Sequence, residues 1–328
     1  MKAWRLHRTG EPTSVMSLEQ VDEPAPEAGQ VLVRVRSAAV NFPDAMMCRG
    51  EYQIRPPLPF TPGVELCGEV VALGEGVTGP GVGARVIGSP VLPHGAFAEF
   101  ALMDAARTFP APDALDDAEA SAFHIGYQTG WFGLHRRAAL RAGETLLVHA
   151  AAGGVGSAAV QLGKAAGARV IGVVGGAAKA EAARQSGADL VVDRHSEDFV
   201  QVVKEATGGR GADVVYDPVG GDAYAGSTKC VAFEGRIVVV GFASGSIPTP
   251  GLNHALVKNY SVLGLHWGLY DRHDPKAVRE AHRELSGLAA AGLVKPLVSE
   301  RVPLAGAADA VQRVADGSTV GRIAVLPA

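Results

Sequence analysis

A glycine-rich turn between a predicted strand and a predicted helix constrains this chain more than any other feature. The apolar strand Thr145–Ala150 precedes the turn, and a helical segment begins at Gly154. Backbone N–H groups at such a helix start can receive a pyrophosphate, whose charge the helix dipole favours. Ala151 replaces the first glycine of the common Gly-x-Gly-x-x-Gly pattern. We expect the cofactor contacts of this turn to be Ala152, Gly153, Gly154, Val155 and Gly156.

From residue 145 onward, short apolar runs alternate with helical segments. This alternation predicts a parallel, doubly wound sheet with right-handed crossovers. The expected strands are 145–150, 168–174, 189–192, 213–216, 236–241 and 261–265, and the clearest helices between them are 154–166, 179–186 and 198–206.

The first third of the chain has the rhythm of short β-strands separated by Gly-rich turns. Such a pattern predicts a small, partly closed antiparallel barrel. Its expected strands are 31–36, 68–74, 85–88 and 95–101. After a predicted helix from Pro275 to about Ala291, the chain is expected to return to this first domain with strands 296–303 and 320–326.

The residues after the second predicted strand of the sheet favour NADPH over NADH. An NAD-binding protein usually has Asp or Glu there for the ribose hydroxyls. This chain instead has Gly175 and three further small residues, followed by the cation Lys179. Arg194 follows the third strand, and two cations near the ribose suit a 2′-phosphate. The alternative, that both are solvated surface charges, remains open.

Composition excludes several classes of protein. The net charge of -4 over 328 residues is unlike that of a dedicated nucleic-acid binder. The three cysteines are widely spaced and form no C-x-x-C motif, so we expect no disulfide framework and a cytoplasmic location. No signal peptide and no apolar stretch of membrane-spanning length is visible. We therefore expect neither a nucleic acid nor a membrane as partner.

Several segments, in order along nearly the whole chain, resemble the zinc-independent quinone oxidoreductases. This zeta-crystallin-like branch belongs to the medium-chain dehydrogenase/reductase superfamily. The segments that carry the resemblance are Val148–Gly156, Asn41–Tyr52, Pro62–Val70, Tyr127–Trp131, Gly211–Gly220 and Val320–Val325.

The resemblance implies an α/β protein of two domains. A GroES-like β-barrel catalytic domain would comprise residues 1–120 and 268–328. A Rossmann domain that binds NADP, with a doubly wound parallel sheet, would comprise residues 121–267. The active site of such relatives lies in the cleft. The cofactor-binding residues that the resemblance implies are Asn41, Thr129, the turn from Ala152 to Gly156, Gly175, Lys179, Gly241 and Phe242. Arg194, our further candidate, stands where relatives often have Tyr.

Zinc-dependent relatives have a Gly-His-Glu motif and a lobe with four cysteines. Here the corresponding strand reads Gly63-Val64-Glu65, the lobe cysteines are absent, and no histidine cluster has the spacing of zinc ligands. We expect no metal. Hydride transfer then belongs to the cofactor, and a protein group stabilises charge on the acceptor oxygen. Tyr52 is our first candidate for that donor and Asn41 our second.

The expected activity is NADPH-dependent hydride transfer to a quinone or a related electrophilic carbonyl. An NADPH-dependent enoyl or enal reductase is the alternative within the same fold, and a structural or RNA-binding crystallin-like protein is the alternative of another class. The resemblance also implies a homodimer, paired through the edge strand at Ser261–Leu265.

Overall fold

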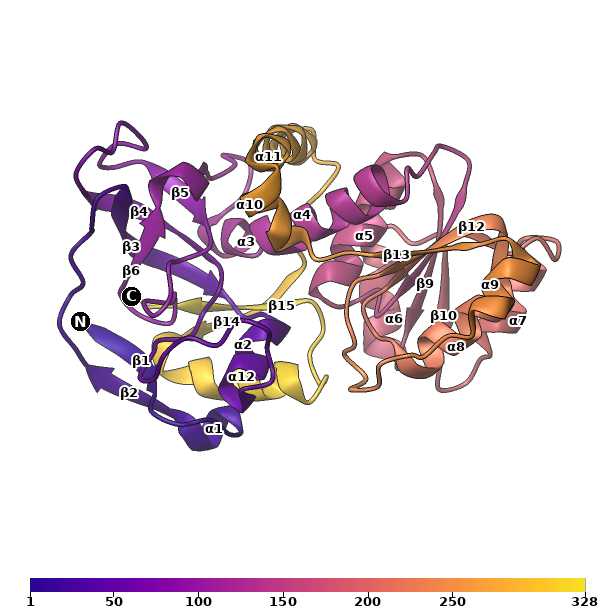
Figure 1. Cartoon of the computed structure of the whole chain (residues 1–328), viewed down its shortest axis with the longest axis horizontal. Helices are drawn as coiled ribbons and strands as arrows, with labels where there is room; N and C mark the ends of the chain where they lie inside the picture. Colours follow the sequence, from indigo (N-terminus) through magenta and orange to yellow (C-terminus); the bar gives the residue numbers. More distant parts are fainter. Residues whose placement is uncertain (328) are drawn as a thin grey trace. The chain divides into compact units, whose positions relative to one another are not determined.

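The computed structural model describes residues 1–327 and divides into two compact units (Figure 1). The first unit comprises Met1–Ile125 and the segment from Pro296 onward, and the second comprises Gly126–Lys295. Among the described residues, no helix combines the length and apolar character that a membrane span requires.

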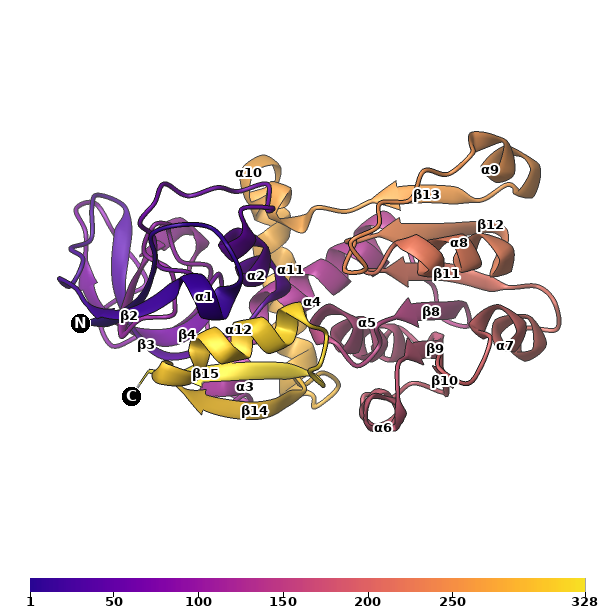
Figure 2. The same cartoon turned by 90° about the horizontal axis from the view of Figure 1, so that it is seen from below.

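The second unit is built on a six-stranded parallel sheet. Its strand order is β10-β9-β8-β11-β12-β13, which confirms the predicted doubly wound topology. Helices α5 and α6 lie in the connections from β8 to β9 and from β9 to β10, which run toward one edge of the sheet. Helices α7 and α8 lie in the connections from β10 to β11 and from β11 to β12, which run toward the other edge. Because the crossovers are right-handed, the two pairs of helices cover opposite faces of the sheet (Figure 2). The strands are β8 (Thr145–His149), β9 (Arg169–Val174), β10 (Leu190–Asp193), β11 (Ala212–Asp217), β12 (Val231–Val239) and β13 (Ser261–Gly264). The four helices are α5 (Gly154–Ala165), α6 (Ala177–Gln185), α7 (Phe199–Ala206) and α8 (Gly221–Cys230).

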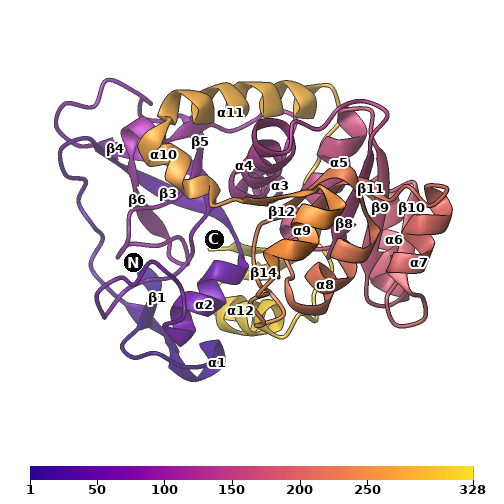
Figure 3. The same ribbon diagram turned by 45° about the vertical axis from the view of Figure 1, so that its right-hand side comes forward.

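Further helices of this unit, of which Figure 3 labels α4, α9, α10 and α11, precede β8 or flank β13 in the sequence. They are α4 (His124–Trp131), the π-helical turn η2 (Phe132–Arg137), α9 (Leu252–Lys258), η3 (Trp267–Leu269), α10 (Tyr270–His273) and α11 (Pro275–Ala290). The central strand β8 is buried along its whole length, as expected for a parallel strand with helices on both faces.

Residues 268–295 belong to the second compact unit, whereas the predicted division assigned them to the first domain. Helix α11 accounts for the difference because α4 is hydrogen-bonded to it. Gln128 Nε2 donates to the Val278 carbonyl at 3.1 Å, and Trp131 Nε1 donates to Glu284 at 2.8 Å. The sequence offered no sign of these contacts, which join residues about 150 positions apart. The predicted functional division into two domains stays a prediction.

The first unit contains a mostly antiparallel seven-stranded sheet and a separate two-stranded one. The main sheet has the order β14-β15-β3-β4-β5-β7, with β6 pairing β3, and β1 pairs β2. The strands are β1 (Lys2–Leu6), β2 (Met16–Gln20), β3 (Gln30–Ala39), β4 (Leu66–Leu73), β5 (Arg85–Gly88), β6 (Phe100–Asp104), β7 (Phe109–Pro110), β14 (Val298–Pro303) and β15 (Arg322–Leu326). The helices are α1 (Pro12–Val15), α2 (Phe42–Arg49), η1 (Ala105–Arg107), α3 (Asp117–Ser121), η4 (Leu304–Gly306) and α12 (Ala307–Ala315).

The strand predicted over 95–101 is wrong, because β6 begins only at Phe100. The preceding residues are held in an irregular segment by hydrogen bonds to the turn before β4. Ala96 N–H donates to the Gly63 carbonyl at 2.9 Å, and Phe97 N–H donates to the Pro62 carbonyl at 3.0 Å. The segment is nevertheless core, since Phe97 is fully buried. The alternation of apolar residues therefore predicted the burial of this segment correctly and its strand conformation incorrectly.

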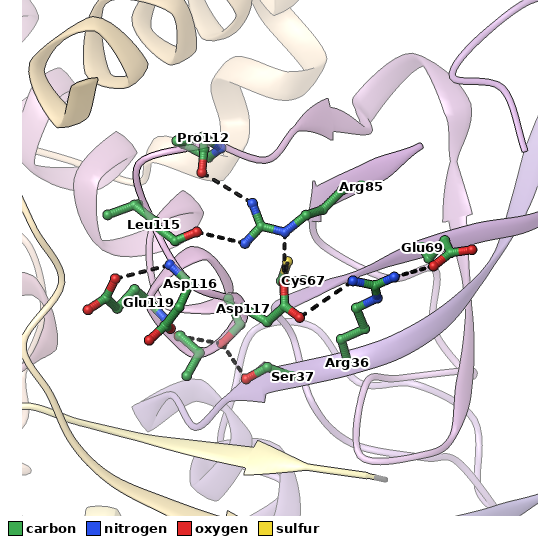
Figure 4. Close-up of polar contacts among 12 residues, drawn as sticks. Arg36, Ser37, Cys67, Glu69, Arg85, Pro112, Leu115, Asp116, Asp117 and Glu119 are labelled. Atoms are coloured by element: carbon green, nitrogen blue, oxygen red, sulfur yellow. Dashed lines mark hydrogen bonds and ion pairs between the residues drawn. The ribbon is translucent and has the colours of Figure 1, made fainter. Parts of the chain in front are cut away.

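A polar network fixes the start of α3 to the main sheet (Figure 4). Asp117 is at its centre, where its Oδ1 accepts from Arg85 Nε at 2.7 Å and its Oδ2 lies 3.7 Å from Arg36. Arg85 also donates to the Leu115 carbonyl at 2.8 Å, and the buried Cys67 thiol lies 3.6 Å from Asp117 Oδ1. Burial raises the pKa of Cys67 to about 12, so this thiol is held as an unreactive group. All three cysteines are buried free thiols in the structure.

Asp117→Ala should destabilise the first unit modestly. The carboxylate is about one-third exposed, so solvent screens its two ion pairs and we expect a loss of about 1 kcal/mol. Chemical denaturation followed by circular dichroism would measure this loss. Asp22→Ala, at an exposed position in the loop after β2, is the matched control. Equal stability of both variants would contradict a structural role for the network.

Candidate functional site

The glycine-rich turn connects β8 to α5 as predicted. Ala150 has a positive φ of 50°, and Gly153 N–H donates back to its carbonyl at 2.8 Å. A Cβ at Gly156 would lie 2.1 Å from the Ala150 carbonyl oxygen, so only glycine fits there. The first N–H groups of α5, from Gly154 to Gly156, have no acceptor within the helix. They form a set of donors at a helix start that suits an anionic group.

A buried polar group supports the strand that leads into this turn. His149 Nε2 lies 2.8 Å from Ser227 Oγ, and that hydroxyl donates to the Ala223 carbonyl at 2.7 Å. Because the single hydroxyl hydrogen is used, Ser227 accepts from His149, which therefore carries its proton on Nε2. Burial lowers the pKa of His149 to about 4, and the negative charge of Asp217 opposes that shift. The imidazole is neutral in the folded protein.

The predicted ribose-phosphate residues gather at the end of β9. A Cβ at Gly175 would lie 3.0 Å from Arg194 Nε, so the guanidinium folds back over this glycine. Lys179 lies in the first turn of α6. Burial lowers the pKa of its ammonium, and the positive charge of Arg194 lowers it further. Two cations thus lie near residues 175–178, which carry no acidic side chain of their own, although the Asp193 carboxylate accepts from Gly176 N–H at 2.9 Å.

Gly241 and Phe242 follow β12 at the same edge of the sheet. A Cβ at Gly241 would lie 3.3 Å from the Pro218 carbonyl oxygen, and one at Gly220 would lie 2.9 Å from the Phe242 ring. Asp217 organises this region, since its Oδ1 accepts from the N–H groups of residues 219 and 220. Its Oδ2 is buried and has no hydrogen-bond partner among residues 1–327. The turn after β8, Gly175 and Gly241 therefore lie together at the carboxyl ends of the strands, where ligands of doubly wound sheets bind.

Thr129 is buried in α4 of the same unit, at 5% exposure. Its predicted role toward a carboxamide stays a prediction.

In the first unit, Asn41 precedes α2 and belongs to a buried ion cluster. Its amide nitrogen donates to Glu65 Oε2 at 3.0 Å and to the Ala39 carbonyl at 3.0 Å. Arg322 Nη2 donates to the same Glu65 oxygen at 2.8 Å, and Ile125 N–H donates to the other at 2.7 Å. Burial raises the pKa of Glu65, and these donors oppose the shift. Both amide hydrogens of Asn41 are used, so only its oxygen remains for a ligand.

Tyr52 follows α2 and is partly buried against the core of the first unit. Burial raises the pKa of its hydroxyl, and the charge of Asp44 raises it further. Asp44 is itself fully buried, and its carboxylate accepts from the N–H groups of Asn41 at 2.8 Å and Gly63 at 3.1 Å. Burial nevertheless raises the pKa of Asp44 to about 7. Tyr52 therefore stays protonated at neutral pH and can act as a donor, whereas Asn41 in this arrangement cannot.

Two family profiles match the chain. One, described as "Alcohol dehydrogenase GroES-like domain", matches residues 27–113, and one described as "Zinc-binding dehydrogenase" matches residues 154–286. A quinone oxidoreductase-like protein 2 homolog from Nematostella vectensis is 38% identical over 90% of this chain and 81% of its own length. The chain belongs to the medium-chain dehydrogenase/reductase superfamily, among its quinone oxidoreductase-like members. The predicted family and the predicted GroES-like and Rossmann fold are confirmed, and this dehydrogenase/reductase is an oxidoreductase.

Two solved structures extend the comparison. Escherichia coli quinone oxidoreductase complexed with NADPH is 31% identical over all of both chains, with a TM-score of 0.91. Mycobacterial Rv1454c complexed with NADPH is 32% identical over all of both chains, with a TM-score of 0.92. NADPH is thus the cofactor present in two structural relatives of this reductase.

Other residues hold the predicted site residues in place. Glu65 and Arg322 fix Asn41, and Asp44 lies beside Tyr52. All three lie in segments that carry the family resemblance, but no pattern in the sequence pairs them with Asn41 or Tyr52. Within the described part of the chain, no three His, Cys, Asp or Glu side chains gather as metal ligands would. Independence from zinc remains a prediction for this reductase.

His149→Gln should make the reductase less sensitive to acid. The neutral imidazole takes up a proton on unfolding, so its contribution to stability is present above about pH 6.5 and is lost as the pH falls toward 4. At about pH 5.5 the loss is roughly 1 kcal/mol. Glutamine can still donate to Ser227 and does not titrate. Thermal unfolding at about pH 7.5 and 5.5 should therefore show a smaller drop in Tm for His149→Gln than for the wild type.

The exposed His273 in α10 provides the matched control. His273→Gln should leave the pH-dependent drop in Tm as large as in the wild type. The role of His149 is contradicted if both variants respond to acid in the same way.

Proposed function

We propose that this reductase uses NADPH to transfer hydride to a quinone or a related electrophilic carbonyl, without a metal. The choice of NADPH over NADH rests on the residues at the end of β9. Gly175 stands where an NAD-binding protein usually has an acid, and Arg194 and Lys179 lie nearby. The presence of NADPH in two structural relatives supports the same choice.

The residues of the second unit fit this cofactor. The free N–H groups at the start of α5 would receive the pyrophosphate, and the absence of a side chain at Gly156 permits the tight turn that presents them. Lys179 and Arg194 would bind the 2′-phosphate, with which their charges are complementary. When bound, the nicotinamide supplies the hydride.

The residues of the first unit support an acceptor that needs little acid catalysis. The reduced form of a quinone is a stabilised, phenolate-like anion, so one neutral hydrogen-bond donor suffices to handle its oxygen. We assign that task to Tyr52, whose hydroxyl stays protonated at neutral pH. Both amide hydrogens of Asn41 are donated, to Glu65 and to the Ala39 carbonyl, so we assign it the role of a positioning residue whose side-chain oxygen would accept a hydrogen bond from a ligand.

Purified protein should oxidise NADPH faster with 1,2-naphthoquinone or 1,4-benzoquinone than with trans-2-hexenal or crotonyl-CoA. Nicotinamide absorbance would follow the reaction, with NADH as the cofactor control. Tyr52→Phe should lower kcat for the quinones by about 10-fold, because a positioned donor contributes at least that much. Tyr270→Phe is the matched control, since Tyr270 stacks on Phe132 through its ring and should tolerate loss of its hydroxyl.

The acceptor panel separates the alternatives. Turnover confined to hexenal or crotonyl-CoA would replace the quinone proposal by an enal or enoyl reductase. Binding of NADPH without turnover of any acceptor would favour a non-enzymatic, crystallin-like role. Equal use of NADH and NADPH would contradict the proposed cofactor preference.

We also propose a homodimer formed through the second unit. Strand β13 is the last strand of its sheet, and Val262 on it is 43% exposed. Helix α9, which precedes β13, exposes Leu252, Leu256 and Val257 by 77 to 82%. Exposed apolar side chains on an edge strand and on the helix that precedes it suit a second copy of the same chain.

Light scattering at micromolar concentration should therefore give twice the mass of the chain. Leu252→Glu combined with Leu256→Glu places two charges on one face of α9 and should shift the mass to that of a monomer. Val82→Glu, at an exposed apolar position of the first unit, should leave the dimer intact. A monomer mass for the wild type would refute the proposal.

A further inference from the structure

His195 lies at the proposed phosphate site although no motif points to it. A Cβ at Gly175 would lie 3.1 Å from His195 Nε2, and 3.0 and 3.2 Å from Arg194 Nε and Nη2. The imidazole and the guanidinium therefore both fold back over the backbone at the end of β9. Lys179, whose pKa is lowered by the charge of Arg194, is close to the same group. Two side chains that can carry positive charge thus meet over Gly175, and a third lies close enough to Arg194 for the two charges to repel.

Asp193 lies beside this imidazole and accepts from the backbone N–H of the same residue. Its Oδ1 accepts from the N–H groups of Gly176 at 2.9 Å and His195 at 3.1 Å. The same oxygen lies 3.8 Å from His195 Nδ1. The carboxylate therefore faces one ring nitrogen, while the other faces Gly175. The His195 side chain is 61% exposed, so a ligand can reach it.

The two ring nitrogens have different tasks in this arrangement. A neutral imidazole protonated on Nδ1 has only a lone pair on Nε2, which repels a phosphate. The imidazolium donates from both nitrogens and can bridge Asp193 and an anion. Histidine changes its charge between about pH 5 and 8.

We propose that His195 is a third specificity-determining residue for the 2′-phosphate of the cofactor, held beside Gly175 by the hydrogen bond from its backbone N–H to Asp193 and effective when its ring is charged. The inference rests on the proposed use of NADPH. It adds that the preference for the phosphorylated cofactor depends on pH through one side chain. Lys179 and Arg194 would supply the part of the preference that is constant.

Calorimetric titration with 2′,5′-ADP and 5′-AMP tests this without any acceptor. At about pH 6, His195→Gln should weaken binding of 2′,5′-ADP by about 10-fold, and at about pH 8 by about 2-fold. Binding of 5′-AMP should be unchanged at both pH values. The titration of the phosphate itself is common to both proteins, so comparison at one pH cancels it. His273→Gln, with the same change at an exposed site in α10, should bind both ligands as the wild type does.

His195→Arg provides a second variant with a permanent charge. It should bind 2′,5′-ADP as tightly as the wild type at about pH 6 and should not lose the extra affinity at about pH 8. Equal binding of 2′,5′-ADP by His195→Gln and the wild type at both pH values would overturn the inference, as would an equal loss of 5′-AMP binding.

The two proposals fail in different ways. If Lys179→Ala removes the preference for 2′,5′-ADP and His195→Gln preserves it at about pH 6, the role of His195 is wrong and the proposed cofactor stands. If the wild type binds 5′-AMP as tightly as 2′,5′-ADP at both pH values, the proposed cofactor fails and the inference fails with it.

Discussion

The buried carboxylate of Glu65 is the interaction on which the arrangement of the first unit depends. It accepts from Asn41 before α2, from Arg322 at the start of β15 and from the backbone of Ile125. Three segments that are far apart in the chain therefore meet at one fully buried acid. Removing one partner of such a pair leaves a charge buried alone, which typically costs about 3–5 kcal/mol. The position of Asn41 is thus coupled to that of β15, the last strand in the chain, which pairs with β3 in the sheet.

In the second unit, a neutral side chain, that of His149, fixes the strand that leads into the glycine-rich turn. The turn after β8 must bring backbone N–H groups together, and it does so through the positive φ at Ala150 and the absence of a side chain at Gly156. His149 anchors the end of the strand through Ser227 and avoids a buried charge by remaining neutral. Asp217 similarly fixes the loop after β11 by accepting two backbone N–H groups. The donors are therefore in place before any ligand arrives, which reduces the ordering cost of binding.

The sequence predicted those features that are written in local patterns. The parallel sheet, its helices and the phosphate turn were recovered because strand and helix periodicity and glycine spacing act over a few residues. The pair formed by Glu65 and Arg322 spans 257 positions, and no local pattern announces it. The strand prediction for the segment before β6 was wrong for a different reason, since the apolar residues there are buried without forming a strand. His195 was missed because it follows Arg194 in a turn, where only the fold shows that both side chains bend back over Gly175.

The geometry at Gly175 also bears on how cofactor preference changes during evolution. This glycine does not have a positive φ, so its backbone admits any L-residue, and only the ends of two side chains occupy the space a Cβ would need. An aspartate introduced there by a single codon change would supply the acid typical of NAD-binding proteins and would also pair with Arg194 and His195. Gain of one specificity and loss of the other are thus linked at a single position. The lineage of such a reductase could cross between cofactors without passing through a form that binds neither.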